Sequence, residues 1–286
     1  NRFNLLKLSG NIDIDLNKIL ISDIELNEIK GLINKKDTNY YAKINSYDPN
    51  TRLDLEAEAQ YSKLLSTIKL KLDAYNINMN KLKASRNDSL TLVSAFIYAD
   101  FKGQNLDDIT GNAKITNLSY SEGKKRGTID SLILTIVPIS DEEKKIKIIS
   151  DLLDLELNGK IYLSSIDKSF KEYIYAYLPR LMKDTLDKSI EFYQDFNFSM
   201  HIKPPIQNFI DIFIADMTVS QVYLEGAFKS STNELDFDIL IPYAAYNNVV
   251  KADSIHINLE TFNNVAYLNL DLDRVINKDI SASNIE

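Results

Sequence analysis

Strict alternation of apolar and polar residues is the feature that most constrains how this chain folds. In the segment 52–61, Leu, Ala and Tyr occupy every second position, and Arg, Asp, Glu and Gln lie between them. The segment 68–74 repeats the alternation with Lys and Asp as its polar residues. A period of two residues is typical of a β-strand that has one apolar and one polar face. The alternation therefore predicts strands whose polar faces carry opposite charges that can attract one another.

The same alternation continues along the chain and predicts a mainly β protein. Further strands are predicted at residues 90–101, 112–120, 128–137, 145–150, 153–163, 196–202, 221–228, 234–241, 254–260 and 265–273. The connections between the strands are short, and Pro49 stands in one of them at a turn position. Short connections favour an antiparallel meander, in which each strand pairs with the next.

One segment follows a different period. From Ser164 to about Gln194, apolar residues recur every three or four positions, which is typical of an amphipathic helix. Pro179 lies inside this segment and predicts a kink or a second helix. The resulting division of the chain is a β-rich meander at residues 1–163, a helical insertion or cap at residues 164–215 with one strand at about 196–202, and a β-rich continuation of the same sheet at residues 216–286.

The residue types present argue against most kinds of chemistry. The 286 residues include no Cys, which excludes disulfides, thiolate nucleophiles and Cys-bound metal sites. His201 and His256 lie far apart, each in an alternating strand, and no glycine-rich phosphate loop or Gly-x-Ser-x-Gly motif occurs. Neighbouring carboxylates such as Asp107 and Asp108 lack the glycine spacing of calcium loops. We therefore expect a protein that is not an enzyme, with no catalytic residue, no metal site and no cofactor.

Charge and hydropathy limit the partners. The 33 basic and 41 acidic residues give a net charge of −8, and no cluster of Lys and Arg marks a nucleic-acid site. No apolar run approaches the roughly 20 residues that span a bilayer as a helix. The chain begins with Asn1 and carries no signal segment. These features predict a piece of a longer protein, with any membrane anchor outside this segment.

The predicted strands present a large apolar surface that something must cover. Roughly ten strands each carry three to five aliphatic side chains on one face. Such a sheet can pack on a second sheet as a β-sandwich, which is the default arrangement, or close into a barrel. It can also curl into a trough whose apolar interior holds another molecule, such as lipid acyl chains. The alternation alone leaves these three folds open.

Part of the sequence resembles a known family. The segment Phe101–Gly111 reads Phe-Lys-Gly-Gln-Asn-Leu-Asp-Asp-Ile-Thr-Gly. It is similar to the Gly-Asn-Ser-Leu-Asp-Asp-Leu-x-Gly segment of TamB-type proteins, the translocation and assembly module subunits of Gram-negative bacteria. The similarity continues at residues 112–120, 132–135, 150–162, 170–181, 209–216 and 224–228, within an overall span of 89–274. Gln104 departs from the family pattern, which has Asn at that position.

The resemblance implies a fold, a function and a location. TamB-type proteins belong to the AsmA-like group of long, bridge-like lipid-transfer proteins, which are anchored in the inner membrane and cross the periplasm. Their β-taco fold is a curled sheet whose apolar trough is thought to carry phospholipid towards the outer membrane. The resemblance implies that this chain is an internal or C-terminal segment of such a protein. It would lie in the periplasm, bind phospholipid, support outer-membrane biogenesis and protein secretion, and have an outer-membrane barrel protein of the TamA or BamA type as partner.

A lipid trough would assign roles to the apolar faces. Acyl chains gain about 0.8 kcal/mol per buried methylene, so apolar side chains alone can hold a lipid. The candidates for the trough lining are Leu53, Leu55, Leu70, Leu72, Val93, Ile97, Leu132, Leu134, Leu155 and Leu157. The candidates for a helical cap over the trough are Phe170, Ile174, Tyr177 and Leu181.

Two other functions compete with the lipid trough. A chaperone-like or scaffold module would pair its strand edges with unfolded outer-membrane proteins. A β-sandwich adhesin or scaffold would bury its apolar faces between two sheets. Phospholipid bound to the purified chain favours the trough, whereas a closed core without lipid favours the sandwich.

Overall fold

A computed structural model describes residues 9–21, 24–62, 65–83, 90–177, 193–207, 210, 216–247, 249–262, 265–277 and 280–285. Strands account for 71% of the structure, and they form one large antiparallel sheet of 17 strands that is not closed. The chain divides into two compact units, unit 1 at residues 1–134 and unit 2 at residues 135–286. The strand β8 (Lys125–Pro138) contains the division. The predicted mainly β fold is confirmed.

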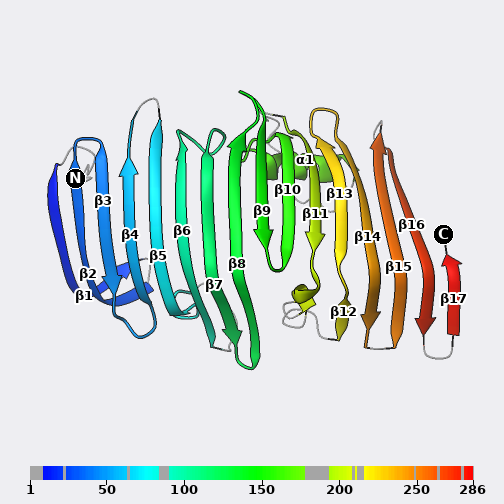
Figure 1. Cartoon of the computed structure of the whole chain (residues 1–286), viewed down its shortest axis with the longest axis horizontal. Helices are drawn as coiled ribbons and strands as arrows, with labels where there is room; N and C mark the ends of the chain where they lie inside the picture. The colour runs from blue at the N-terminus through cyan, green and yellow to red at the C-terminus, as the bar shows by residue number, and fades with distance from the viewer. Residues whose placement is uncertain are drawn as a thin grey trace. The chain divides into compact units, whose positions relative to one another are not determined.

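Unit 1 is an antiparallel meander in which each strand pairs with the next (Figure 1). Its strands before β8 are β1 (Gly10–Ile21), β2 (Ile24–Lys36), β3 (Asn39–Ser46), β4 (Arg52–Gln60), β5 (Ser66–Asn78), β6 (Thr91–Gly103) and β7 (Thr110–Glu122). A turn of two residues joins β2 to β3, and its Asp37 has a φ of 54°. This left-handed conformation is the one that tight hairpin turns require.

The strand register of unit 1 separates apolar from charged side chains. Leu55 of β4 lies opposite Leu72 of β5, which lies opposite Ile97 of β6. On the other face of the sheet, the Glu56 carboxylate lies 2.9 Å from Lys43 Nζ. Each strand thus gives one face to an apolar surface and one to a polar surface, as the alternation predicts.

Two β-bulges flank β6 and leave its own alternation uninterrupted. The register shifts next to Asn76 of β5 and next to Asn117 of β7, and both residues have positive φ angles. The Asn76 N–H donates a hydrogen bond to Ser94 Oγ at 2.8 Å. Because the extra residues lie in the neighbouring strands, β6 alternates without interruption, and Val93 shares a face with Ile97.

Unit 2 is an antiparallel sheet with an α-helix inserted between two of its strands (Figure 1). Its elements after β8 are β9 (Lys144–Ser150), β10 (Leu153–Lys160), α1 (Ile166–Tyr177), β11 (Asp195–Ile202), the 3₁₀ helix η3 (Pro204–Ile206), β12 (Met217–Val219), β13 (Val222–Lys229), β14 (Glu234–Tyr246), β15 (Val250–Phe262), β16 (Val265–Asn277) and β17 (Ile280–Ile285). β11 pairs with β13, and the short β12 pairs with β14.

The helix begins where the change of period predicts it. α1 starts at Ile166, directly after Ser165, and the inserted helix that the sequence predicts is confirmed. Pro179 and Leu181, which belong to the same predicted segment, lie outside the described residues. No described helix is long and apolar enough to cross a membrane.

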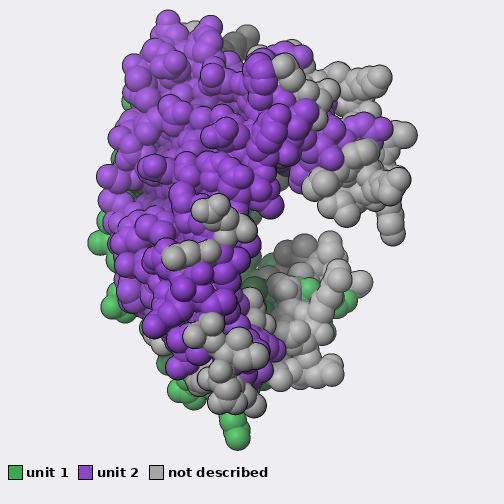
Figure 2. All heavy atoms as spheres, turned by 90° about the vertical axis from the view of Figure 1, so that its right-hand side faces the viewer, with its two compact units in different colours: residues 1–134 green, residues 135–286 purple. Residues whose placement is uncertain are grey.

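Unit 2 is curved around a hollow on one side (Figure 2). The hollow opens to the right in Figure 2. This side of the sheet is turned away from the viewer in Figure 1, and α1 lies on it, behind the strands. The prediction of a curled sheet is therefore confirmed. On the apolar face of unit 2, Leu268 and Leu270 of β16 are 66% and 47% exposed, and Ile68 of β5 in unit 1 is 49% exposed. These parts of the sheet are thus not covered by a second layer.

Candidate functional site

The apolar face of unit 1 is built from rows of side chains that run across the strands. The central row contains Ile14, Gly31, Ile44, Leu55, Leu72, Ile97 and Ile115, each opposite the next. The row beside it contains Ile12, Ile33, Ala42, Ala57, Leu70, Ala99 and Ala113. Every member of the central row is half-buried. The register therefore joins one apolar residue from each strand into a continuous surface that remains in contact with solvent.

The structure brings most of the predicted trough residues of unit 1 together on this face. The residues concerned are Leu53, Leu55, Leu70, Leu72, Val93 and Ile97. Leu132 and Leu134 lie in β8, where both are half-buried and the intervening Ile133 is 37% exposed. The sequence reasoning missed the contributions of β1 to β3, such as Ile44, although the alternation in residues 39–46 is visible in the sequence.

Unit 2 has an apolar face of the same construction. Its central row contains Ile148, Leu155, Met200, Leu224, Ile239, Ile257 and Leu270, each opposite the next. The neighbouring row contains Ile146, Leu157, Phe198, Gly226, Phe237, Leu259 and Leu268. Only Leu155 and Leu157 were predicted trough residues. The alternation in the predicted strands 145–150 and 196–202, and in the four predicted strands from residue 221 to residue 273, was the signal that identifies the others.

α1 packs on one end of this apolar face. Phe170 stacks on Phe228 of β13 with ring centroids 4.6 Å apart, and Tyr173 meets the same ring edge-on at 6.0 Å. Phe196 of β11 completes the cluster at 5.8 Å from Phe228, whose side chain is fully buried. The helix thus covers the end row of the face, and the central row lies beyond it.

A buried glutamine fixes the start of α1 to the sheet. Gln194 Oε1 accepts a hydrogen bond from the Tyr162 N–H at 2.9 Å, and Gln194 Nε2 donates to Ser165 Oγ at 3.0 Å. The Gln194 N–H donates to Ser230 Oγ at 2.8 Å. Gln194 is fully buried, so these bonds replace the water that its amide loses. The contact joins residues 32 positions apart, and no sequence pattern indicates it.

The predicted cap residues differ in position. Phe170 lies in the aromatic cluster, and Tyr177 Oη donates a hydrogen bond to the Asn233 carbonyl at 2.8 Å. Ile174 is 36% exposed. Leu181 lies outside the described residues.

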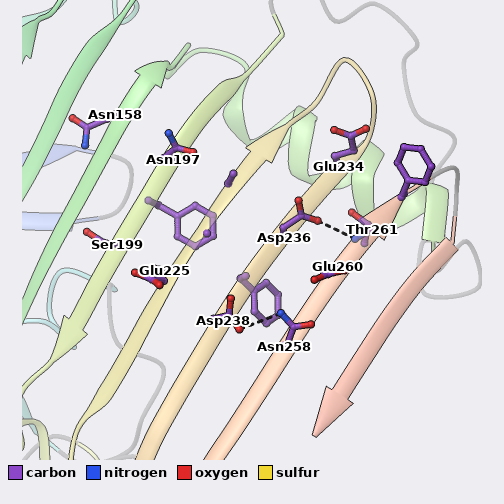
Figure 3. Close-up of a pocket in the computed structure, with 15 residues that line it drawn as sticks. Asn158, Asn197, Ser199, Glu225, Glu234, Asp236, Asp238, Asn258, Glu260 and Thr261 are labelled. Atoms are coloured by element: carbon purple, nitrogen blue, oxygen red, sulfur yellow. Dashed lines mark hydrogen bonds between the residues drawn. The ribbon is translucent and has the colours of Figure 1, made fainter.

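The opposite face of unit 2 is polar and carries a shallow hollow of about 700 Å³. Figure 3 shows its labelled side chains on the strands in front of α1. Asp238 accepts hydrogen bonds from Asn258 Nδ2 at 3.1 Å and from His256 Nε2 at 3.2 Å, and Asp236 accepts one from the Thr261 N–H at 3.0 Å. Among the described residues, no group of three or more His, Cys, Asp or Glu side chains is arranged to hold a metal ion. These polar groups satisfy one another and leave a solvated surface.

Ion pairs between neighbouring strands shift the pKa of several groups on the polar faces. The hydrogen bond and the charge of Lys43 lower the pKa of Glu56, and the same hydrogen bond and the charge of Glu56 raise the pKa of Lys43. Lys160 lowers the pKa of Glu142 in the same way. All of these groups are exposed, so each pair adds little stability.

Comparisons with models of known protein families, with curated proteins and with solved structures give no match. The geometry itself must therefore indicate the chemistry. A continuous aliphatic surface holds ligands by burial and makes no directional contact with them. Such a surface suits molecules with long apolar chains.

Proposed function

We propose that this chain is a segment of a TamB/AsmA-like protein of the periplasm, and that its apolar faces bind and conduct phospholipid acyl chains between the inner and the outer membrane. A longer protein, anchored in the inner membrane and partnered by an outer-membrane barrel of the TamA or BamA type, would place this segment within the envelope. In this role the chain supports outer-membrane biogenesis without catalysing a reaction.

The observation that carries the proposal is the continuity of the apolar rows. Leu55, Leu72 and Ile97 in unit 1, like Leu155 and Met200 in unit 2, lie opposite one another without an intervening charge. A chain that moves along such a row exchanges one aliphatic contact for an equal one, so no position traps it. An acyl chain gains about 0.8 kcal/mol per methylene that leaves water.

The test is whether the purified chain carries phospholipid that depends on the apolar face. We expect mass spectrometry of a solvent extract to detect phospholipid at about one or more molecules per chain. Replacement of Leu72 by Gln places an amide on the face, and an unpaired amide in apolar surroundings costs about 1 kcal/mol or more, which lowers the bound lipid roughly fivefold. The matched control is Lys71→Gln, one residue away on the polar face, which leaves the lipid content unchanged.

Two results contradict the proposal. One is a folded chain without lipid after expression in a cell that synthesises phospholipid. The other is an equal lipid content in the Leu72→Gln and Lys71→Gln variants, because that result means that the apolar face does not hold the lipid.

The alternative function is strand-edge pairing by a chaperone-like or scaffold module. β1 favours it, because this strand stands at one end of unit 1 and its Ile12 and Leu16 are 44% and 39% exposed. A photo-crosslinker at Ile12 that captures an unfolded outer-membrane protein, in a preparation free of lipid, supports this function over the conduit.

A further inference from the structure

An apolar pocket lies at one end of the apolar face of unit 1. Its cavity of about 550 Å³ lies over the last cross-strand row, in which Tyr40, Ala59, Ile68 and Phe101 are opposite one another. Leu106, in the loop after β6, forms one wall. Ile68 and Leu106 are 49% and 59% exposed, so apolar surface in the pocket is accessible to solvent. The volume is typical of small-molecule sites, which measure roughly 300–1,000 Å³.

The loop that carries Leu106 is held by its own polar side chains. Asp108 Oδ1 accepts hydrogen bonds from the N–H groups of Gln104 at 2.9 Å and Asn105 at 2.8 Å. Asn105 Oδ1 accepts a hydrogen bond from the Asp107 N–H at 2.7 Å. Such side-chain to backbone bonds stabilise a turn without help from the rest of the protein. The Asn-Leu-Asp-Asp motif thus builds a fixed wall for the pocket.

A glycine makes room for the aromatic floor of the pocket. Gly111 of β7 lies opposite Phe101 and has a φ of +140°. A Cβ at Gly111 would lie 2.1 Å from the Asp100 carbonyl oxygen and 2.9 Å from Phe101 Cδ1. Only a glycine at this position lets the Phe101 ring lie against the neighbouring strand.

Unit 2 contains the same pairing of a glycine with a phenylalanine, and a side chain of α1 fills the space above that row. Gly159 of β10 lies opposite Phe196 of β11, and a Cβ on this glycine would lie 2.3 Å from the Asp195 carbonyl oxygen. There, α1 places Phe170 over Phe228, the neighbour of Phe196 in the row. In unit 2, a side chain of the helix therefore covers the row that ends in a Phe–Gly pair. In the described part of unit 1, a cavity lies over the corresponding row.

We propose that this pocket binds one acyl chain of an anionic amphiphile, with the anionic group beside Lys35. Lys35 lies opposite Tyr40, and its Nζ is 5.5 Å from the centroid of the Tyr40 ring that lines the pocket. The apolar floor favours a hydrocarbon chain, and the Lys35 ammonium over the Tyr40 ring attracts a carboxylate or phosphate. The inference rests on the proposed function, because the pocket ends the same apolar face, and it adds one defined binding position to a continuous surface.

The test uses the delipidated chain and the fluorescent probe 11-(dansylamino)undecanoic acid. We expect saturable binding of one probe per chain. The Ala59→Phe variant fills the pocket and weakens binding by roughly tenfold or more, whereas Glu58→Phe, the same ring on the opposite face of the same strand, changes it less than about twofold. The Lys35→Gln variant weakens binding of the probe by roughly tenfold and leaves binding of its methyl ester unchanged. Circular dichroism checks that each variant is folded.

The outcomes separate this inference from the proposed function. A probe that binds equally well to the Ala59→Phe and Glu58→Phe variants overturns the pocket, even where phospholipid still copurifies with the chain. An equal loss of acid and methyl ester in Lys35→Gln overturns the anionic preference. Retained probe affinity in Leu72→Gln, together with loss of phospholipid, supports a pocket distinct from the rest of the face.

Discussion

Phe170 of α1 and Phe228 of β13 stack with their ring planes only 5° apart. This pair is one of the contacts that hold the helix to the sheet, since Phe228 is fully buried and Tyr173 packs on its edge. The same pair closes one end of the apolar face of unit 2.

Replacement of Phe170 by Ala should destabilise unit 2. The change removes a stacked ring and leaves a cavity over Phe228, which costs about 2–3 kcal/mol for a half-buried ring. Urea unfolding followed by circular dichroism measures the loss. Tyr175→Ala, on the exposed side of the same helix, is the control and should change stability by less than about 0.5 kcal/mol. Equal effects of the two substitutions would show that the helix is not held by this stack.

Replacement of Gln194 by Leu should cost about 3 kcal/mol. The leucine has nearly the same volume but leaves the Tyr162 N–H and the buried Ser165 hydroxyl without their amide partner. Thermal unfolding measures the effect, and Gln60→Leu, at an exposed position of β4, provides the comparison. A melting temperature unchanged in Gln194→Leu would mean that the amide does not fix the helix.

Replacement of Gly111 by Ala should destabilise unit 1 by about 3 kcal/mol or more, because the new Cβ collides with the Asp100 backbone. Gly10→Ala is the matched control. Gly10 has a similar φ of +148°, but nothing lies within 4 Å of a Cβ built there. The difference between the two unfolding free energies therefore isolates the collision, and its absence would contradict the close packing of Phe101 on β7.

Asp48 should make the stability of unit 1 depend on pH in the acid range. Burial of Asp48 raises the pKa of its carboxyl, but hydrogen bonds from Asn50 and Asn27 outweigh this and lower the pKa below its usual value. A depressed pKa in the folded state means that the stabilisation is complete above the unfolded pKa of about 4 and is lost as the pH falls through the folded pKa.

The measurement is the urea midpoint of the unmodified chain and of Asp48→Asn from pH 7 to pH 2. We expect the unmodified chain to be the more stable at pH 7 and the difference to shrink below about pH 4. A constant difference over the whole range would contradict the role of the Asp48 carboxylate.

Local patterns in the sequence predicted most of the strands and the helix. The alternation in residues 52–61 and 68–74 identified β4 and β5, because a strand with one wet face needs a period of two. The change to a period of three or four identified α1, whose Phe170 and Tyr173 share a face.

Contacts between distant residues were beyond these patterns. Nothing in the sequence places Gln194 against Tyr162, because that contact depends on where β11 returns to the sheet. The bulges at Asn76 and Asn117 were also not predicted, since their positive φ angles leave no periodic signal. The candidate face was predicted in part: the parity of Leu55 and Leu72 follows from alternation, but their alignment with Ile97 requires the register.

The cross-strand row from Ile14 to Ile115 has one further consequence, which concerns length. Each strand contributes one residue, and neighbouring strands are roughly 4.8 Å apart, so the seven strands β1–β7 give a path of roughly 29 Å. The number of strands therefore sets the length of the row. Gain or loss of one hairpin would change the length of the row by roughly 10 Å and leave every remaining cross-strand contact in place, so the apolar row can be lengthened or shortened without redesign of its surface.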